Sequence, residues 1–349
     1  MRALLTLCLL VFVADAARAE LLMYEGFNYP AGERLIGQTN ANGKTWIDPT
    51  APIQPGPTST PASPGDLDGD GFSQVDPQVL EANDIVYPGL ASTPGNHFDV
   101  PKGILDAPND GSTQGNIVRT VLPLPAGRDP VTGSYTSSDS SLFYSFTLRL
   151  TQYGGSQTAP NLIAGFHWGN DVVGSGMSNT APFVGSLRLR PSAGGTYQLG
   201  LSKDGNAPGV VWDTATYTPL EDTLLVVVEY DLVGNNTSAA NTDDVARLWI
   251  NPAPGQPAGV PTLVVTAGAD PFASQAAVPA QSIPFVAASG AIRSFYFRSD
   301  RQTPGLMHVD DLRIGTTFAD VTPAVPEPST MALAALGIVA IGMRRRYAA

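Results

Sequence analysis

The chain has 349 residues, of which 31 are acidic and 19 are lysine or arginine, so its formal net charge is −12. An acidic surface with few lysines argues against binding nucleic acid, because such binding depends on neutralising phosphates. The single cysteine, Cys8, lies in an apolar segment near the N-terminus, so the rest of the chain has neither disulfides nor thiol chemistry.

Residues 1–19 are predicted to be a cleavable secretory signal peptide. Arg2 is followed by an apolar stretch, Ala3–Ala14, and then by Ala17 and Ala19, the small residues of a cleavage site. The apolar stretch spans only about 18 Å as a helix, whereas the hydrocarbon core of a bilayer is about 30 Å thick. Cleavage after Ala19 is therefore expected, and an uncleaved membrane anchor is the alternative.

Residues 20–322 are predicted to form one all-β domain. Between Leu142 and Leu150, apolar side chains alternate with Ser145, Thr147 and Arg149, which is the period of a half-buried strand. Similar short segments follow one another with no helix-length amphipathic run between them, which predicts an antiparallel sandwich or barrel. The other candidate strands are 21–27, 85–90, 117–122, 162–168, 187–190, 197–201, 224–232, 245–250, 263–266, 292–298 and 307–314.

Four short sequence segments of this domain resemble the concanavalin A-like (laminin G-like) jelly rolls of other exported proteins. They are Tyr24–Gly32, Tyr87–Leu90, Leu248–Pro252 and Val309–Gly315. The resemblance implies an antiparallel jelly-roll β-sandwich in which the first and last strands pair, with Tyr24–Phe27 beside Asp311–Ile314. The resemblance assigns no function, because that fold occurs in lectins, glycosidases, lyases and structural modules alike.

An aspartate-rich loop within residues 48–80 is a candidate calcium site. Asp66, Asp68 and Asp70 alternate before a glycine, which is the opening of a loop whose carboxylates converge on a hard cation. An EF-hand loop needs a glutamate at its twelfth place, where Pro77 is found instead, with Asp76 one place early. Bound Ca²⁺ would fix this loop, and a solvated Asp-Gly turn is the alternative.

No catalytic residue is predicted, although one pair of acids lies on a single predicted strand. Glu229 and Asp231 point to the same face of a strand, as the paired acids of laminarinase-type glycosidases do. That family's motif needs a further glutamate, but Val233 and Gly234 occupy its places. Legume lectins hold metals with a similar pair and an asparagine four residues later, which Asn235 matches, but their later ligands are not recognisable. We interpret both acids as residues of the polar face of the strand.

Histidines and tryptophans give weaker signals of a site. No pair among His97, His167 and His308 has the spacing of metal ligands, so we interpret the three as hydrogen-bonding residues on strand surfaces. Trp46 and Trp212 lie near Gly, Asp and Pro residues. Both are candidates for stacking on a sugar ring, because an indole presents a large apolar face beside a polar N–H.

The C-terminal segment 323–349 is predicted to be a sorting tail. Its parts, in order, are Pro326, Glu327 and Pro328, an apolar run at 331–343, and the cluster Arg344, Arg345 and Arg346. As a helix the run is about 20 Å long, so it suits a temporary membrane anchor with the arginines on the cytoplasmic side. This order resembles the PEP-CTERM sorting signal of Gram-negative bacteria, which implies processing by an exosortase, a membrane protease. An ordinary tail anchor is the alternative.

Together these features predict a non-catalytic protein of the cell envelope. Its tail is expected to hold it transiently in the inner membrane before processing, after which it lies at the cell surface or outside the cell. The resemblance to PEP-CTERM proteins implies an association with exopolysaccharide, and Ca²⁺ is the only cofactor expected. Two alternatives stay open: a glycan-active hydrolase or lyase on the same fold, and a scaffold that binds another envelope protein.

Overall fold

The computed structural model describes fifteen strands, two short helices and the loops next to them. The described residues are 20–31, 35, 37–47, 78–80, 85–93, 95–100, 116–122, 141–151, 161–168, 183–204, 209–233, 243–267, 292–299 and 307–325. The predicted signal peptide with Ala17 and Ala19, the loop with Asp66, Asp68, Asp70 and Asp76, and the tail after Val325 lie outside them. Within the described part of the chain, no helix is long and apolar enough to cross a bilayer.

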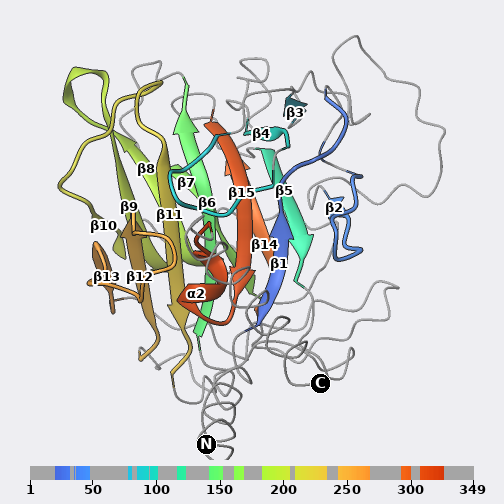
Figure 1. The fold of residues 1–349 in the computed structure, drawn as a ribbon. Coiled ribbons are helices and arrows are strands. Elements are labelled where there is room, and N and C mark those ends of the chain that lie inside the picture. The colour runs from blue at the N-terminus through green and yellow to red at the C-terminus, as the bar shows by residue number, and fades with distance from the viewer. Residues whose placement is uncertain are drawn as a thin grey trace, which may run out of the picture.

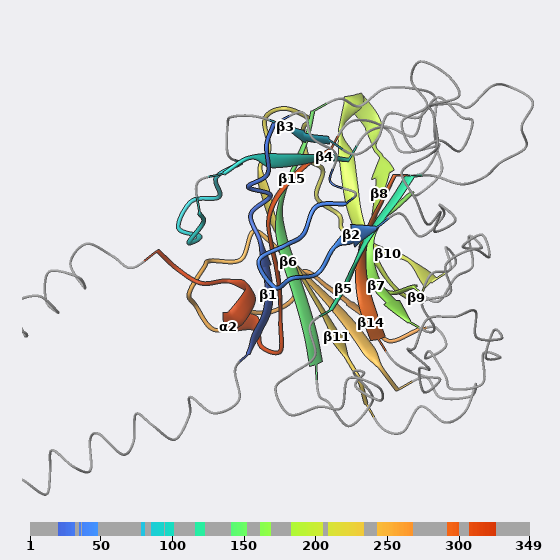
Figure 2. The same cartoon turned by 90° about the vertical axis from the view of Figure 1, so that its right-hand side faces the viewer.

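Two antiparallel sheets pack face to face (Figure 1, Figure 2). The first sheet has the order β13 (Leu263–Val265), β12 (Val245–Ile250), β11 (Leu224–Asp231), β6 (Ser141–Leu150), β15 (Met307–Gly315), β4 (His97–Val100) and β3 (Gln78–Leu80), and β1 (Leu21–Glu25) also pairs with β15. The second has the order β10 (Val211–Trp212), β9 (Tyr197–Asp204), β8 (Phe183–Pro191), β7 (Asn161–Trp168), β14 (Ile292–Ser299), β5 (Asn116–Val121) and β2 (Trp46–Ile47). The predicted antiparallel β-sandwich is confirmed.

The core lies between the two sheets and is built from alternate residues of the strands. Tyr144 and Phe146 of β6 are buried there, and they meet Phe295 and Phe297 of β14. The ring centroids of Tyr144 and Phe295 are 5.1 Å apart, and those of Phe146 and Phe297 are 5.3 Å apart. Aromatic rings attract one another in this edge-to-face arrangement. The packing fixes which face of each strand points inward, so Arg149 on β6 points outward.

The last strand, β15, has a different partner on each part of its outer edge. β1 pairs with its second half, where Tyr24 lies opposite Arg313 and Glu25 opposite Leu312, so the predicted pairing of the first and last strands is confirmed. β4 pairs with its first half, with His308 opposite Asp99 (Figure 1). On the other edge β15 pairs with β6 along most of its length. Three distant parts of the chain therefore meet around one strand.

Two features of the sheets differ from the prediction. Residues 85–90 form a turn instead of a strand, since Pro88 and Gly89 favour a turn, Gly89 has a φ of 81°, and the N–H of Leu90 bonds the carbonyl of Tyr87. The short strands β2, β3, β4 and β10 were not predicted. Each has two to four residues, and so few residues cannot reveal a period of two.

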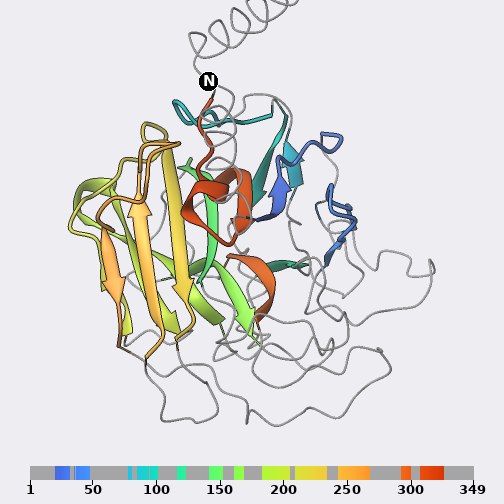
Figure 3. The same ribbon diagram turned by 60° about the horizontal axis from the view of Figure 1, so that its bottom comes forward.

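A short helix, α2 (Phe318–Val321), lies on the outer face of the first sheet, away from the second (Figure 2). Thr317 and Asp320 form a capping box that fixes its first turn. Figure 3 shows β11, β12 and β13 side by side, with α2 next to them. Under the helix lies a second buried cluster, formed by Leu90, Phe143, Leu225, Val227, Trp249, Phe318 and Val321. The 3₁₀ turn η1 (Ala193–Gly195) joins β8 to β9.

Candidate functional site

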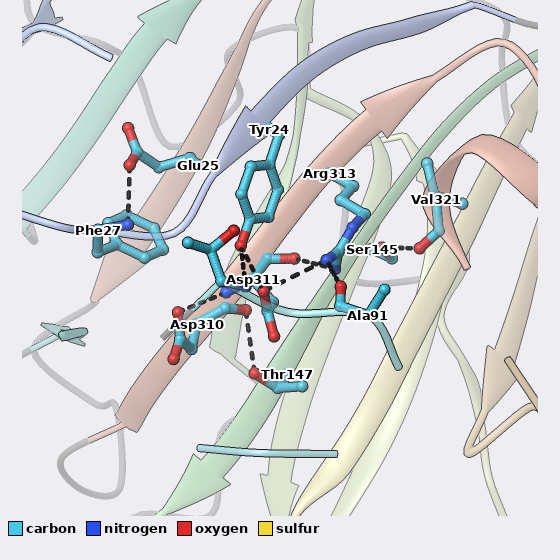
Figure 4. A network of polar contacts seen from close by, with 11 residues as sticks. Tyr24, Glu25, Phe27, Ala91, Ser145, Thr147, Asp310, Asp311, Arg313 and Val321 are labelled. Carbon is cyan, nitrogen blue, oxygen red and sulfur yellow. Dashed lines mark hydrogen bonds and ion pairs between the residues drawn. The ribbon is translucent and has the colours of Figure 1, made fainter. Parts of the chain in front are cut away.

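A polar network joins the first and last strands on the outer face of the first sheet (Figure 4). The Tyr24 hydroxyl donates to Asp311 Oδ1 (2.9 Å) and accepts from the N–H of Thr93 (3.0 Å), while the Arg313 guanidinium lies 4.7 Å from the centre of the Tyr24 ring. Arg313 also donates to Asp311 Oδ1 (3.3 Å) and to the carbonyl of Ala91. An irregularity in β15, at which Asp311 has a φ of 55°, turns its carboxylate to this face. The bonds of this network close within the protein, which fits a structural role.

Glu25, at the end of β1, accepts hydrogen bonds from three donors. They are the N–H of Phe27 (2.8 Å), the hydroxyl of Tyr29 (2.6 Å) and Nε1 of Trp46 (3.1 Å). Burial raises the pKa of the Glu25 carboxyl above its usual value. Trp46 is fully buried and stacks on Phe297, with 6.2 Å between the ring centroids. This corrects the prediction that Trp46 contacts a ligand: its apolar ring completes the core and its N–H satisfies a buried acid.

The acids Glu229 and Asp231 lie on the outer face of β11 beside Arg247 of β12. Nη1 of Arg247 is 2.7 Å from a carboxylate oxygen of Glu229 and 3.1 Å from one of Asp231. The two acids therefore share one cation and hold neighbouring strands together. This arrangement agrees with the interpretation of both residues as part of the polar face of the strand.

Two histidines and an aspartate converge on the same outer face, near the start of β15. Phe98 and Val309 point into the core, so His97 and Asp99 on β4 and His308 on β15 point away from it. Asp99 Oδ1 lies 3.1 Å from Nε2 of His308 and 3.7 Å from Nε2 of His97. The three residues each offer one ligand atom within 4.8 Å of the others. His97 and Asp99 are buried, whereas His308 is partly exposed.

The surroundings of this cluster favour the neutral forms of Asp99 and His308. Burial raises the pKa of the Asp99 carboxyl to about 7. Burial, together with repulsion from His97 and Arg149, lowers the pKa of the His308 imidazole to about 4. Arg149 lies opposite His308 on β6, and its Nη2 donates to the carbonyl of Leu220 (2.7 Å). A neutral imidazole has a free lone pair, which is the form that binds metals.

The sequence does not reveal this cluster, because the spacing of histidines along the chain does not determine their distance in the fold. The two residues on β4 are separated by one position, as same-face residues of a strand must be, but β4 itself was not predicted. Only the pairing of β4 with β15 brings His308 to them. The third histidine, His167, lies on β7 in the second sheet.

Trp212 lies on the edge strand β10 of the second sheet and is half-buried. Its ring covers Gly200 of β9 so closely that a Cβ on this glycine would lie 2.5 Å from the ring. The Arg190 guanidinium lies over the ring, 4.4 Å from its centre, and its Nε donates to Oε1 of Gln198 (2.9 Å). Gln198 Nε2 in turn donates to the carbonyl of Asp213 (2.9 Å). We call these five residues the Trp212 surface.

The C-terminal residues 324–346 match the model of the PEP-CTERM protein-sorting motif. The motif indicates a secreted protein with a C-terminal membrane anchor before processing, and it implies recognition by an exosortase. The matched segment lies almost entirely beyond the described residues and covers only the tail. None of the curated protein sequences compared with the chain is similar to it.

Several solved structures are similar to the chain, each at low identity and with a low TM-score. The carbohydrate recognition domain of Emp47p is 11% identical, with a TM-score of 0.36, over 87% of this chain and 99% of that one. A protein of unknown function from Shewanella oneidensis MR-1 is 12% identical, with a TM-score of 0.36, over 92% and 96%. A PL7 alginate lyase from Zobellia galactanivorans is 11% identical, with a TM-score of 0.34, over 67% and 83%. Similarity this distant assigns no function.

The sheet topology and the tail motif together identify the chain as an exported β-sandwich protein that carries a PEP-CTERM sorting motif.

Proposed function

We propose that this protein is a non-catalytic envelope or extracellular module that binds polysaccharide through the Trp212 surface. The observation that supports this proposal is a partly exposed indole ring held in place at the edge of a sheet. Export by the PEP-CTERM route would bring that ring into contact with glycans outside the cell.

The Trp212 surface is built in a way that suits a sugar. Trp212 lies on Gly200 and beneath Arg190, and Arg190 is itself held by Gln198. Side chains that are fixed before binding lose little conformational entropy when a ligand arrives. The part of the Trp212 indole that Gly200 and Arg190 leave exposed offers an apolar contact for the C–H groups of a sugar, and the Arg190 guanidinium beside it offers hydrogen bonds for the sugar hydroxyls. Carboxylate groups of an acidic polysaccharide would gain most from Arg190.

The proposal that the protein is not an enzyme depends on its acids. A glycosidase needs one carboxyl that gives a proton and a second that attacks or activates water, on opposite sides of the glycosidic bond. Glu229 and Asp231 point from one strand to one cation, Arg247. Two carboxylates that share one guanidinium suit a structural ion pair better than the separate acid and nucleophile of a hydrolase.

Affinity electrophoresis of the processed protein, through gels that contain the producer's exopolysaccharide, tests the proposal. We expect Trp212→Ala to weaken binding about 30-fold, since a central aromatic contact contributes roughly 2 kcal/mol. The matched control is Val211→Ala, on the same edge strand but facing the opposite way, which should bind as the wild type does. Unchanged binding by Trp212→Ala would refute the proposal, and release of reducing ends from the polysaccharide would support a glycan-active hydrolase or lyase instead.

A further inference from the structure

The geometry points to a transition-metal site, with Zn²⁺ as its expected occupant, formed by Nε2 of His97, Oδ1 of Asp99 and Nε2 of His308. This inference is independent of the proposed glycan binding, because the cluster lies on the first sheet and the Trp212 surface on the second. No spacing rule in the sequence indicates the site. Its three residues meet only because β4 pairs with β15.

The positions of the donor atoms fit a small metal ion. Zinc bonds to nitrogen and oxygen are about 2.0–2.2 Å long, so two ligands of a tetrahedral site lie about 3.3–3.6 Å apart. The distances from Asp99 Oδ1 to the two imidazole nitrogens, 3.1 Å and 3.7 Å, are close to this range. The two imidazole rings lie against each other, with 4.4 Å between their centroids and 21° between their planes. Nε2 of each ring lies within 3.7 Å of the same carboxylate oxygen, so side-chain rotations would suffice to place an ion between the three atoms.

The chemistry of the donors selects the metal. Two imidazoles and one carboxylate suit Zn²⁺ and its first-row neighbours, whereas Ca²⁺ takes six to eight oxygen ligands. The Asp99 carboxylate is buried beside two imidazoles, and a divalent cation would give it a full counter-charge. This site differs from the predicted calcium loop in position, in ligand type and in the expected ion.

The surroundings define what the bound ion could do. Three protein ligands leave one tetrahedral position for water or an anion, and the partly exposed His308 marks the side from which it would enter. Arg149 lies beside His308 on that side of the strand pair. Its positive charge weakens the hold on a cation and favours an anionic fourth ligand, such as a hydroxide or a carboxylate. Within the protein the ion would clamp β4 to β15.

Isothermal titration of the full processed protein with ZnCl₂, without a polyhistidine tag, tests the site. We expect one Zn²⁺ per chain in the wild type. Loss of a residue that only hydrogen-bonds to a metal ligand weakens metal binding about 10- to 100-fold. His97→Gln and His308→Gln each remove a ligand itself, so each should weaken binding by more than this. His167→Gln is the matched control, since it removes the one histidine outside the cluster and should leave the affinity unchanged. Circular dichroism of each variant establishes that it is folded.

A second measurement separates this site from nonspecific binding. Co²⁺ bound in a tetrahedral site with nitrogen ligands gives intense visible absorption bands, which added Zn²⁺ should abolish and added Ca²⁺ should not. No Zn²⁺ binding by the wild type, or equal affinity in the folded His97→Gln and His308→Gln variants, would overturn the inference. Neither result involves a polysaccharide, so failure here and failure of the proposed function can be told apart.

Discussion

Replacing Glu25 by glutamine tests how the buried acid at the end of β1 stabilises the fold. The carboxylate accepts from Phe27, Tyr29 and Trp46, and an amide of the same shape has only one oxygen to replace the two carboxylate oxygens. With that oxygen toward Tyr29 and Trp46, the amide NH₂ faces the N–H of Phe27, and one bond to a charged acceptor is lost. Such a bond contributes about 1.5–3 kcal/mol, and the other two bonds weaken because their acceptor becomes neutral.

A second effect acts in the opposite direction. Burial raises the pKa of Glu25 above 4.5, so the folded protein disfavours the ionised carboxylate, and the neutral amide avoids that cost. The expected net result for Glu25→Gln near neutral pH is therefore a loss of about 1–3 kcal/mol from the free energy of unfolding. This loss should depend on pH, since the amide does not titrate.

The sign of this dependence follows from the direction of the pKa shift. Because the folded-state pKa of Glu25 lies above the unfolded value, the carboxyl's contribution to stability is fully present below pH 4.5 and declines as the pH rises through the folded-state pKa. The difference between the wild type and Glu25→Gln should thus be larger at about pH 5 than at about pH 8.

Urea unfolding followed by tryptophan fluorescence measures the difference at both pH values. Glu221→Gln, at an exposed glutamate, is the matched control and should change stability by less than about 0.5 kcal/mol. If the deficit of Glu25→Gln increased with pH, the argument that desolvation dominates at this carboxyl would be refuted. If there were no deficit at either pH, the three hydrogen bonds would contribute nothing to stability.

Two further substitutions test the packing on the two outer faces. Phe318→Ala removes from α2 a buried ring whose centroid lies 5.2 Å from that of Trp249, so urea unfolding should show a loss of about 3 kcal/mol; a loss below about 1 kcal/mol would mean that the cluster under the helix collapses to fill the space. Gly200→Ala places a Cβ 2.5 Å from the Trp212 ring, which must then shift, so affinity electrophoresis should show weaker polysaccharide binding. Gly259→Ala, where a Cβ meets nothing within 4 Å, is its control. Equal binding by the two variants would contradict the proposal that the Trp212 ring, held on Gly200, contacts the polysaccharide.

Much of the fold follows from local patterns in the sequence. The alternation at Leu142–Leu150 predicts the longest strand, and the structure places its apolar residues in the core. The segments Tyr24–Gly32 and Val309–Gly315 resemble concanavalin A-like jelly rolls, which implies that the first and last strands pair. The structure contains this pairing. The tail motif is a short linear sequence, so it can be recognised without knowledge of the fold. These features depend on neighbouring residues, or on a pattern that the chain shares with other proteins.

The candidate sites depend on contacts between distant residues, which local patterns do not specify. Trp46 and Trp212 look alike in the sequence, yet one is fully buried against Glu25 and the other is only half-buried over Gly200.

The pairing of β4 with β15 likewise brings His97 and Asp99 to His308. A period of two determines which residues share a face of a strand, and that much the sequence determined by itself. Which strands become neighbours is decided by burial of the whole core, so only the tertiary structure placed these side chains together.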